Sequence, residues 1–211
     1  ALIALNMFSL DKLDSDFPKI FSTISNRIVW DALKKFVQLV PEKSKFIYSS
    51  LLTLANSILL STSSPPDQVT IMFELLMELE VPASFYSIPL INQYAIHLTA
   101  RSTNVRATAF KFILRYQRMA PSNDVALRIT SNIATELNPQ LRVESLKELY
   151  LAEVDIPIIR VFESMLHDLD SNVRVGSFRI LVKFANVSPA PEIISNLLME
   201  RVRNIQHSKK S

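Results

Sequence analysis

A short motif that occurs three times in the second half of the chain constrains its fold more than any other feature. The copies read NVRATAFK at 104–111, QLRVESLK at 140–147 and NVRVGSFR at 172–179. Their arginines, Arg106, Arg142 and Arg174, lie 36 and then 32 residues apart. A period in this range, with apolar residues at helical spacing inside each copy, predicts an array of similar helical units.

The rest of the chain also reads as helices separated by prolines. Period-2 alternation is nearly absent, and the 211 residues include eleven prolines but only one glycine, Gly176. Because proline ends helices and glycine is needed in tight hairpins, this balance favours an all-α protein. We expect helices at roughly 17–25, 27–40, 43–61, 67–80, 83–100, 104–119, 122–137, 140–152, 156–168, 172–185 and 190–205.

Each copy of the motif opens the second helix of a helical hairpin. Two weaker copies lie upstream, RIVWDALK at 27–34 and QVTI at 68–71. We therefore predict one domain over residues 1–205, part of a larger protein, followed by a frayed tail at 206–211. Its fold would be a right-handed α-solenoid of about five antiparallel helix pairs plus a terminal helix.

The motif resembles the HEAT repeat, whose second helix begins with Val-Arg after a loop that contains an acidic residue. Asp168 lies six residues before Arg174, and Glu136 lies six before Arg142, whereas Ala100 takes the equivalent place before Arg106. The resemblance implies a HEAT/armadillo-like fold and says little about function, since such folds serve many.

On a helical wheel the repeated arginine falls among apolar residues, so we expect it to be buried and paired. Its partner would be the acid of its own loop, Asp168 for Arg174 and Glu136 for Arg142, or an acid of the adjacent repeat. Such pairs would fix the register in which the hairpins stack. A direct role in binding a ligand is the alternative.

The opposite side of these second helices is the predicted solvent-facing arc. It comprises Thr108, Lys111 and Arg115, then Glu144, Lys147 and Leu151, then Gly176, Arg179 and Lys183. The position five residues after each arginine is basic, and Lys34 matches it in the first weak copy. We therefore predict a basic ridge that binds a partner, or else a merely solvated face, formed by Lys34, Lys111, Arg115, Arg118, Lys147, Arg179 and Lys183.

Several kinds of site are disfavoured by composition. The chain has no cysteine, its three histidines lack metal-ligand spacing, and no glycine-rich phosphate loop occurs. No apolar run reaches the length of a membrane span. We expect no enzymatic activity, no cofactor, no bound metal and no small-molecule substrate, and we take a cytoplasmic or nuclear location as the default.

The leading hypothesis is a non-enzymatic scaffold or adaptor domain that binds another protein, one with an acidic surface or segment, within a larger complex. Two alternatives remain. One is a tubulin-binding domain similar to the TOG family, which is also built from HEAT repeats. The other is a chromosome-associated HEAT subunit that contacts nucleic acid through the basic ridge, for which the net charge of +3 leaves room.

Overall fold

The computed structural model describes residues 31, 34–35, 37–38, 41–185 and 190–208, and every regular element among them is helical. The all-α prediction is confirmed for this part of the chain. The chain divides into two compact units, residues 1–94 and 95–211. The predicted helix at 17–25 and most of the helix at 27–40 fall outside the described residues, and a single domain over 1–205 stays a prediction.

The first unit packs its described helices around a core of large apolar side chains. Its elements are α4 (Pro41–Leu59), α5 (Pro66–Glu78), the 3-10 helix η1 (Ala83–Phe85) and α6 (Ile88–Tyr94). The ring of Tyr94 meets that of Phe73 edge to face, with centroids 6.1 Å apart. Its hydroxyl donates a 2.6 Å hydrogen bond to Oδ1 of Asn56, so this buried polar group is satisfied. Helix α6 is thereby tied to α4 and α5.

The single helix predicted over 83–100 is wrong, because the chain breaks there into three short pieces. Pro89 interrupts the periodic run, since it has no N–H to donate and crowds the preceding turn. Helix α6 accordingly begins at Ile88, and the Ser87 hydroxyl accepts a hydrogen bond from the Leu90 N–H at 3.3 Å. After Tyr94 the chain tightens into the 3-10 helix η2 (Ala95–Thr99).

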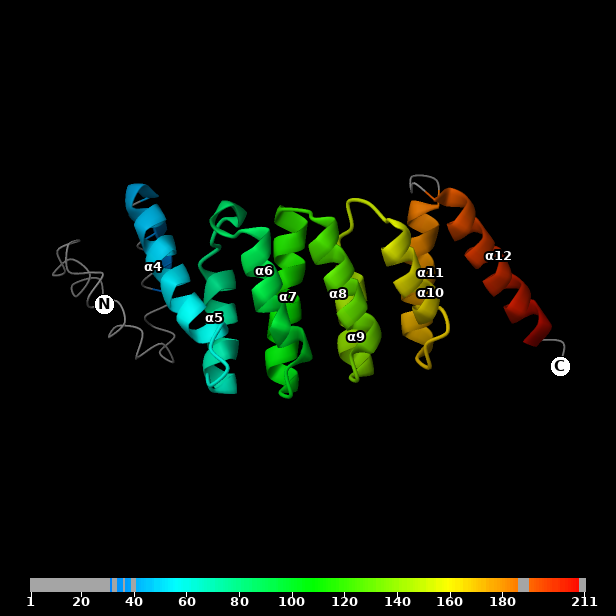
Figure 1. The fold of residues 1–211 in the computed structure, drawn as a ribbon, viewed down its shortest axis with the longest axis horizontal. Helices are drawn as coiled ribbons and strands as arrows, with labels where there is room; N and C mark the ends of the chain where they lie inside the picture. The colour runs from blue at the N-terminus through cyan, green and yellow to red at the C-terminus, as the bar shows by residue number, and fades with distance from the viewer. Residues whose placement is uncertain (1–30, 32–33, 36, 39–40, 186–189, 209–211) are drawn as a thin grey trace. The chain divides into compact units, whose positions relative to one another are not determined.

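In the second unit, most helices contact a helix one place or two places further along the chain (Figure 1). Helix α7 contacts α9, α9 contacts α11, and α8 contacts α10, so two rows of helices form. After η2 the elements are α7 (Thr103–Met119), α8 (Asn123–Thr135), α9 (Pro139–Glu148), α10 (Ile156–Met165), α11 (Ser171–Phe184) and α12 (Pro191–Ser208).

Each of α7, α9 and α11 begins with a capping side chain four residues before its arginine. Ser102 accepts from the Val105 N–H at 3.5 Å, and Asn138 accepts from the amides of Gln140 and Leu141 at 3.0 and 3.2 Å. Asp170 accepts from the Asn172 N–H at 2.7 Å. Since a cap satisfies amides that have no partner inside the helix, the three caps set a common start for the three helices.

Three predicted helix ends in the second unit differ from the structure by three residues or more. Helix α9 ends at Glu148 rather than at 152, and α10 ends at Met165 rather than at 168. In the other direction, α12 continues to Ser208, three residues into the predicted tail, while residues 209–211 lie outside the described part. No helix in the described part of the chain is both long and apolar enough to cross a membrane.

Candidate functional site

The three repeated arginines are held first by the loop that precedes their own helix. The Nη1 atom of Arg106 donates to the carbonyl oxygen of Ala100 at 2.8 Å. Arg142 donates in the same way to Glu136 O at 2.7 Å, and Arg174 to Asp168 O at 2.7 Å. The acceptor is six residues before the arginine each time, so its main chain, not its side-chain type, provides this contact.

The carboxylates of these loops pair with the arginine of the preceding copy. Arg106 donates from Nε to Oε2 of Glu136 at 2.7 Å and from Nη2 to Oε1 at 2.9 Å. Arg142 donates from Nη2 to Oδ1 of Asp168 at 2.9 Å. Pairing within one copy, predicted first, is therefore wrong, and the alternative partner, an acid of the adjacent repeat, is the one that the structure contains.

Glu136 is the more deeply buried of the two acids, with 1% of its side chain exposed. Burial disfavours its charged form, but the hydrogen bonds from Arg106 and the 2.8 Å hydrogen bond from the Asn138 N–H outweigh this effect. The pKa of Glu136 is lowered as a result, and the same hydrogen bond raises the pKa of Arg106. The two-fold contact is the geometry in which a guanidinium binds a carboxylate best.

The second pair is similar but less complete. Asp168 also accepts from the amide two residues further on, that of Asp170, at 2.8 Å. Arg142 uses one nitrogen for this acid and leaves its buried Nε without a hydrogen-bond partner. The side chains are 12% and 13% exposed for Arg142 and Asp168. These two pairs join α7 to the loop before α9, and α9 to the loop before α11.

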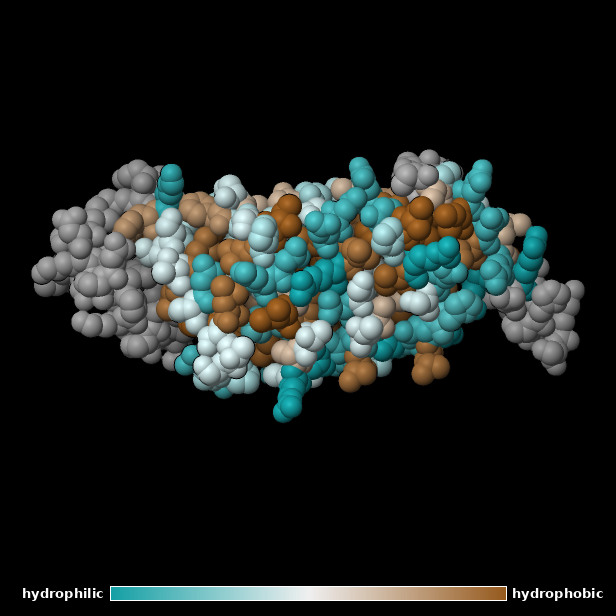
Figure 2. All heavy atoms as spheres, in the orientation of Figure 1, coloured by the Kyte–Doolittle hydropathy of each residue, from teal (hydrophilic) through white to brown (hydrophobic). Residues whose placement is uncertain are grey.

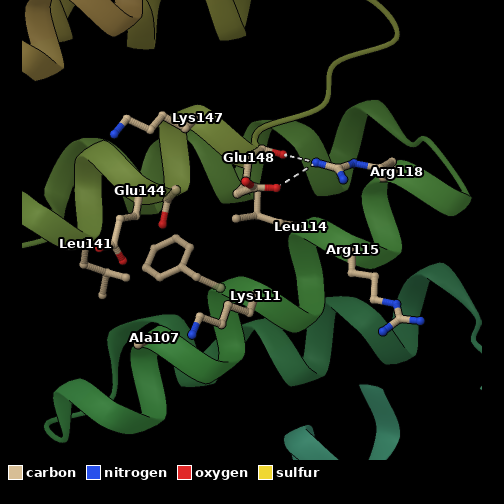
Figure 3. Close-up of a pocket in the computed structure, with 11 residues that line it drawn as sticks. Ala107, Lys111, Leu114, Arg115, Arg118, Leu141, Glu144, Lys147 and Glu148 are labelled. Atoms are coloured by element: carbon tan, nitrogen blue, oxygen red, sulfur yellow. Dashed lines mark hydrogen bonds and ion pairs between the residues drawn. The ribbon is translucent and has the colours of Figure 1, made fainter. Parts of the chain in front are cut away.

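Between α7 and α9 lies a groove of about 470 Å³ that collects four of the seven residues predicted to bind a partner. These are Lys111, Arg115, Arg118 and Lys147. Figure 3 shows Lys111 on the α7 side and Lys147 on the α9 side. The same groove holds two acids, Glu144 and Glu148, so its charge is mixed rather than purely basic.

The floor of this groove is apolar. Phe110, Leu114 and Leu141 line it and are buried, with 1%, 4% and 6% exposed. At the C-terminal end of both helices, Arg118 donates to a Glu148 carboxylate oxygen at 2.9 Å and to its carbonyl oxygen at 3.3 Å (Figure 3). This pair is exposed and screened by solvent, so it contributes little to stability, but it closes one end of the groove.

Lys111 and Lys147 form no hydrogen bond or ion pair with any residue of the described chain, and both are exposed. Each can therefore approach a carboxylate of a partner without first giving up an internal contact. Glu144 accepts from the Gln140 side chain at 2.9 Å and does not form an ion pair with either lysine. The groove thus offers two available cations above an apolar floor.

A second hollow, of about 580 Å³, follows between the starts of α9 and α11. Glu144 and Lys147 line it as well, together with Asp170 and Asn172 of the next copy. The two hollows therefore share the exposed side of α9. An extended or helical segment could lie along this side and contact more than one copy of the motif.

The remaining three predicted residues do not belong to the groove. Lys34 lies in the first unit, where its Nζ contacts Glu78 Oε1 at 3.2 Å. Arg179 lines a different hollow, beside Arg174. The Lys183 ammonium lies 5.5 Å from the ring centroid of Phe184, a cation–π contact. Of the seven residues predicted to form the ridge, the structure thus brings together Lys111, Arg115, Arg118 and Lys147 at one groove.

Three residues of the predicted solvent-facing arc are placed differently by the structure. Thr108 is buried, with its hydroxyl donating to the Asn104 carbonyl at 2.8 Å. Leu151 is buried and lies beyond the end of α9. Gly176 faces α9, since a Cβ added to it would lie 3.4 Å from Cδ1 of Leu146. For Thr108 and Gly176 the helical wheel failed because it treats a helix as exposed on one side, whereas α7 and α11 have helices packed around them, and for Leu151 it failed because the helix ends first.

Two leucines that sequence reasoning did not single out are the most exposed large apolar residues of the described chain. Leu137 and Leu169 are 89% and 99% exposed and occupy the same place in the loops before α9 and α11. Apolar groups protrude at this loop edge in Figure 2. The signal in the sequence was their equivalent position, one residue after each paired acid.

A metal site is not formed in the part of the chain that the structure describes, where no group of three or more His, Asp or Glu side chains converges. The candidate site therefore consists of the α7–α9 groove and the arginine–acid pairs that hold its walls together. Comparisons with protein-family models, with curated proteins and with solved structures gave no match to this chain.

Proposed function

We propose that this chain is a HEAT-like α-solenoid domain that acts as a scaffold or adaptor and binds another protein through the α7–α9 groove. The arrangement of the second unit supports the solenoid, because α7, α8 and α9 each pack against the next helix but one and equivalent arginine–acid pairs recur between successive copies. Stacks of this kind provide long surfaces suited to partner segments.

The observation that carries the binding proposal is the pair of available lysines over an apolar floor. Lys111 and Lys147 flank a groove whose floor includes Phe110 and Leu141. An amphipathic partner segment fits this chemistry if it places an apolar side chain on the floor and carboxylates beside the two lysines. Burial of the apolar side chain would provide most of the affinity, and the lysines would select the acidic sequence and speed association.

Nucleic acid fits the groove less well than protein does. Glu144 and Glu148 line the same walls as the lysines and would repel a phosphate backbone. The aromatic ring of Phe110 is buried and unavailable for stacking on a base. The mixed charge is instead what is expected of a surface that recognises a particular polypeptide sequence.

A displayed library of random peptides tests the proposal even though the natural partner is unidentified. The wild-type protein should enrich sequences in which apolar residues alternate with Asp or Glu. The double variant Lys111→Glu/Lys147→Glu should lose these sequences, with affinities of selected peptides at least tenfold lower by fluorescence anisotropy.

The control variant is Lys45→Glu/Arg203→Glu, which makes the same change in net charge at exposed residues outside the groove. Binding of the selected peptides should be unchanged in this control. Enrichment of basic sequences would contradict the proposal, as would equal loss in both variants. A duplex DNA arm at the same ionic strength should show no binding that depends on the two lysines.

A further inference from the structure

The last arginine of the series, Arg174, has the same surroundings as the first two except for a carboxylate. Its Nη1 donates to the carbonyls of Asp168 and Leu169 at 2.7 and 2.8 Å, as Arg106 does to Ala100 and Arg101 at 2.8 and 3.0 Å. No acid of the described chain forms an ion pair with Arg174. Residues 201–211 include no Asp or Glu.

The helix that carries Arg174 also repeats the apolar face that α7 presents to α9. Sixty-eight residues separate Arg106 from Arg174, and the same shift relates three apolar positions of α7 to three of α11. These pairs are Ala107 with Val175, Phe110 with Phe178 and Leu114 with Val182. Packing against α9 buries Phe110 and Leu114, whereas Val175 and Val182 are 48% and 49% exposed. Helix α11 thus leaves half exposed two apolar positions equivalent to ones beside α9 on α7, although α12 also contacts α11.

A hollow of about 500 Å³ lies between this side of α11 and α12. Arg174, Arg179 and Arg201 line it together with the apolar Val175, Phe178 and Val202. Three cations without an acid in the lining give this hollow a positive charge, in contrast to the mixed charge of the α7–α9 groove. Charge complementarity therefore requires an acidic occupant.

We propose that the Arg174 face of α11 binds a helix of a partner protein whose N-cap residue lies two residues after an Asp or Glu. The two internal pairs define this occupant. Glu136 lies two residues before the cap Asn138, and Asp168 lies two before the cap Asp170. The partner's acid pairs with Arg174, and its helix covers Val175, Phe178 and Val182 as α9 covers their equivalents on α7. This inference does not depend on the α7–α9 groove.

A peptide copied from the chain itself is a suitable probe. Residues 135–149 contain Glu136, the cap Asn138 and the whole of α9. Nuclear magnetic resonance titration of the wild-type protein with this peptide should shift the amide signals of α11. A second peptide with Glu136→Gln should bind at least fivefold more weakly, because it keeps the helix and the apolar side chains but removes the charge.

Two protein variants locate the binding. Arg174→Gln should weaken binding of the unmodified peptide by the same factor. This variant should then bind the unmodified peptide no more tightly than the Glu136→Gln peptide. Val175→Glu should prevent binding by placing a charge on the apolar face, and since Val175 is half exposed, the fold should persist. The matched control Arg160→Gln removes an exposed arginine of α10 that pairs only with Glu163, and it should change nothing.

The proposal is overturned if neither peptide binds, if both bind equally, or if the Arg174→Gln protein still prefers the acidic peptide. Sedimentation of the protein alone distinguishes another occupant. If the wild type forms dimers that Val175→Glu converts to monomers, a second copy of this chain covers the face and the partner proposal is wrong. A wild type that stays monomeric while binding the acidic peptide supports it.

Discussion

Arg106 and Arg174 begin equivalent helices and make the same main-chain contacts, yet only Arg106 has a carboxylate partner. The comparison separates two influences on a buried guanidinium. The loop carbonyls six residues upstream hold it in place in every copy, with or without an acid. The acid comes from the next copy, so the ion pair marks a junction between copies and is not needed to position the arginine within its own.

The two complete pairs also differ from each other. Glu136 accepts two hydrogen bonds from Arg106 and is almost wholly buried, whereas Asp168 accepts one from Arg142 and is 13% exposed. Upstream of them the sequence has neither member of a pair, since the weak copy at 68–71 has Thr70 at the arginine position and Ala100 stands at the acid position. A buried charge without its partner is expensive, which explains why this upstream junction lacks both the arginine and the acid.

Removal of Glu136 should have the largest effect on stability of any change considered. The Arg106 side chain is only 14% exposed, so Glu136→Ala leaves a largely buried guanidinium without its carboxylate. The substitution also removes the acceptor of the Asn138 N–H. We expect the free energy of unfolding to fall by about 3 kcal/mol. Arg174→Gln should lower it by only about 1 kcal/mol, because two hydrogen bonds are lost and no buried acid is left unpaired. Urea unfolding followed by circular dichroism measures both.

A double replacement is the control for this difference. In Arg106→Met/Glu136→Leu no charge remains to be paired, so the protein should regain part of the stability lost in Glu136→Ala. Equal losses for Glu136→Ala and Arg174→Gln would show that the main-chain contacts, and not the carboxylate, dominate the energetics of the arginine.

Acidification should weaken the Arg106–Glu136 junction and leave Arg174 unaffected. The pKa of Glu136 is lowered from its usual value of 4.5, so the folded state favours the ionised carboxylate. Its contribution to stability is complete above the pKa of the unfolded chain and is lost as pH falls through the lower pKa of the folded state. The stability difference between wild type and Glu136→Gln should therefore be constant above about pH 5.5 and shrink below about pH 4.5.

Unfolding in urea at a series of pH values measures this difference directly. Glu136→Gln is the suitable reference because glutamine has the size of glutamate and does not titrate. Arg174→Gln in the same series should differ from wild type by an amount that does not change with pH. A difference for Glu136→Gln that increased on acidification would mean that burial dominates and that the pKa of Glu136 is raised.

The helices of the second unit could be predicted from the sequence because local signals mark their starts. Caps four residues before each arginine and the proline at the start of α9 act within one turn, and the predicted helices match α7 to α12 to within a few residues. Residues 83–100 could not be predicted as a single piece, since Pro89 and Ser87 restart the helix inside an otherwise periodic run.

The sequence predicted residues of the candidate site correctly only where the position of a residue on its own helix decides whether its side chain is exposed. Lys111 and Lys147 are exposed, as their places on the wheel indicate, and they reach the same groove because α7 and α9 are equivalent helices. The partner of each arginine was not predictable from spacing alone. An acid lies six residues from the arginine of its own copy, and it lies 26 or 30 residues from the arginine of the preceding copy. Only the way in which the copies pack against each other therefore selects the partner.

Gly176 offers the finest test of the contrast between the side of α11 that packs on α9 and the side on which Val175 and Val182 are half exposed. Its φ is not positive, so the backbone does not require glycine. An added Cβ would lie 3.4 Å from Cδ1 and 3.8 Å from Cβ of Leu146, at the close limit of ordinary contact. Because alanine gains about 1 kcal/mol over glycine inside a helix, Gly176→Ala should raise the free energy of unfolding by about 0.5 kcal/mol. Gly176→Val, whose branched side chain would crowd Leu146, should lower it. If Gly176→Ala instead lowered the free energy of unfolding, α9 and α11 would approach each other too closely for any side chain at this position.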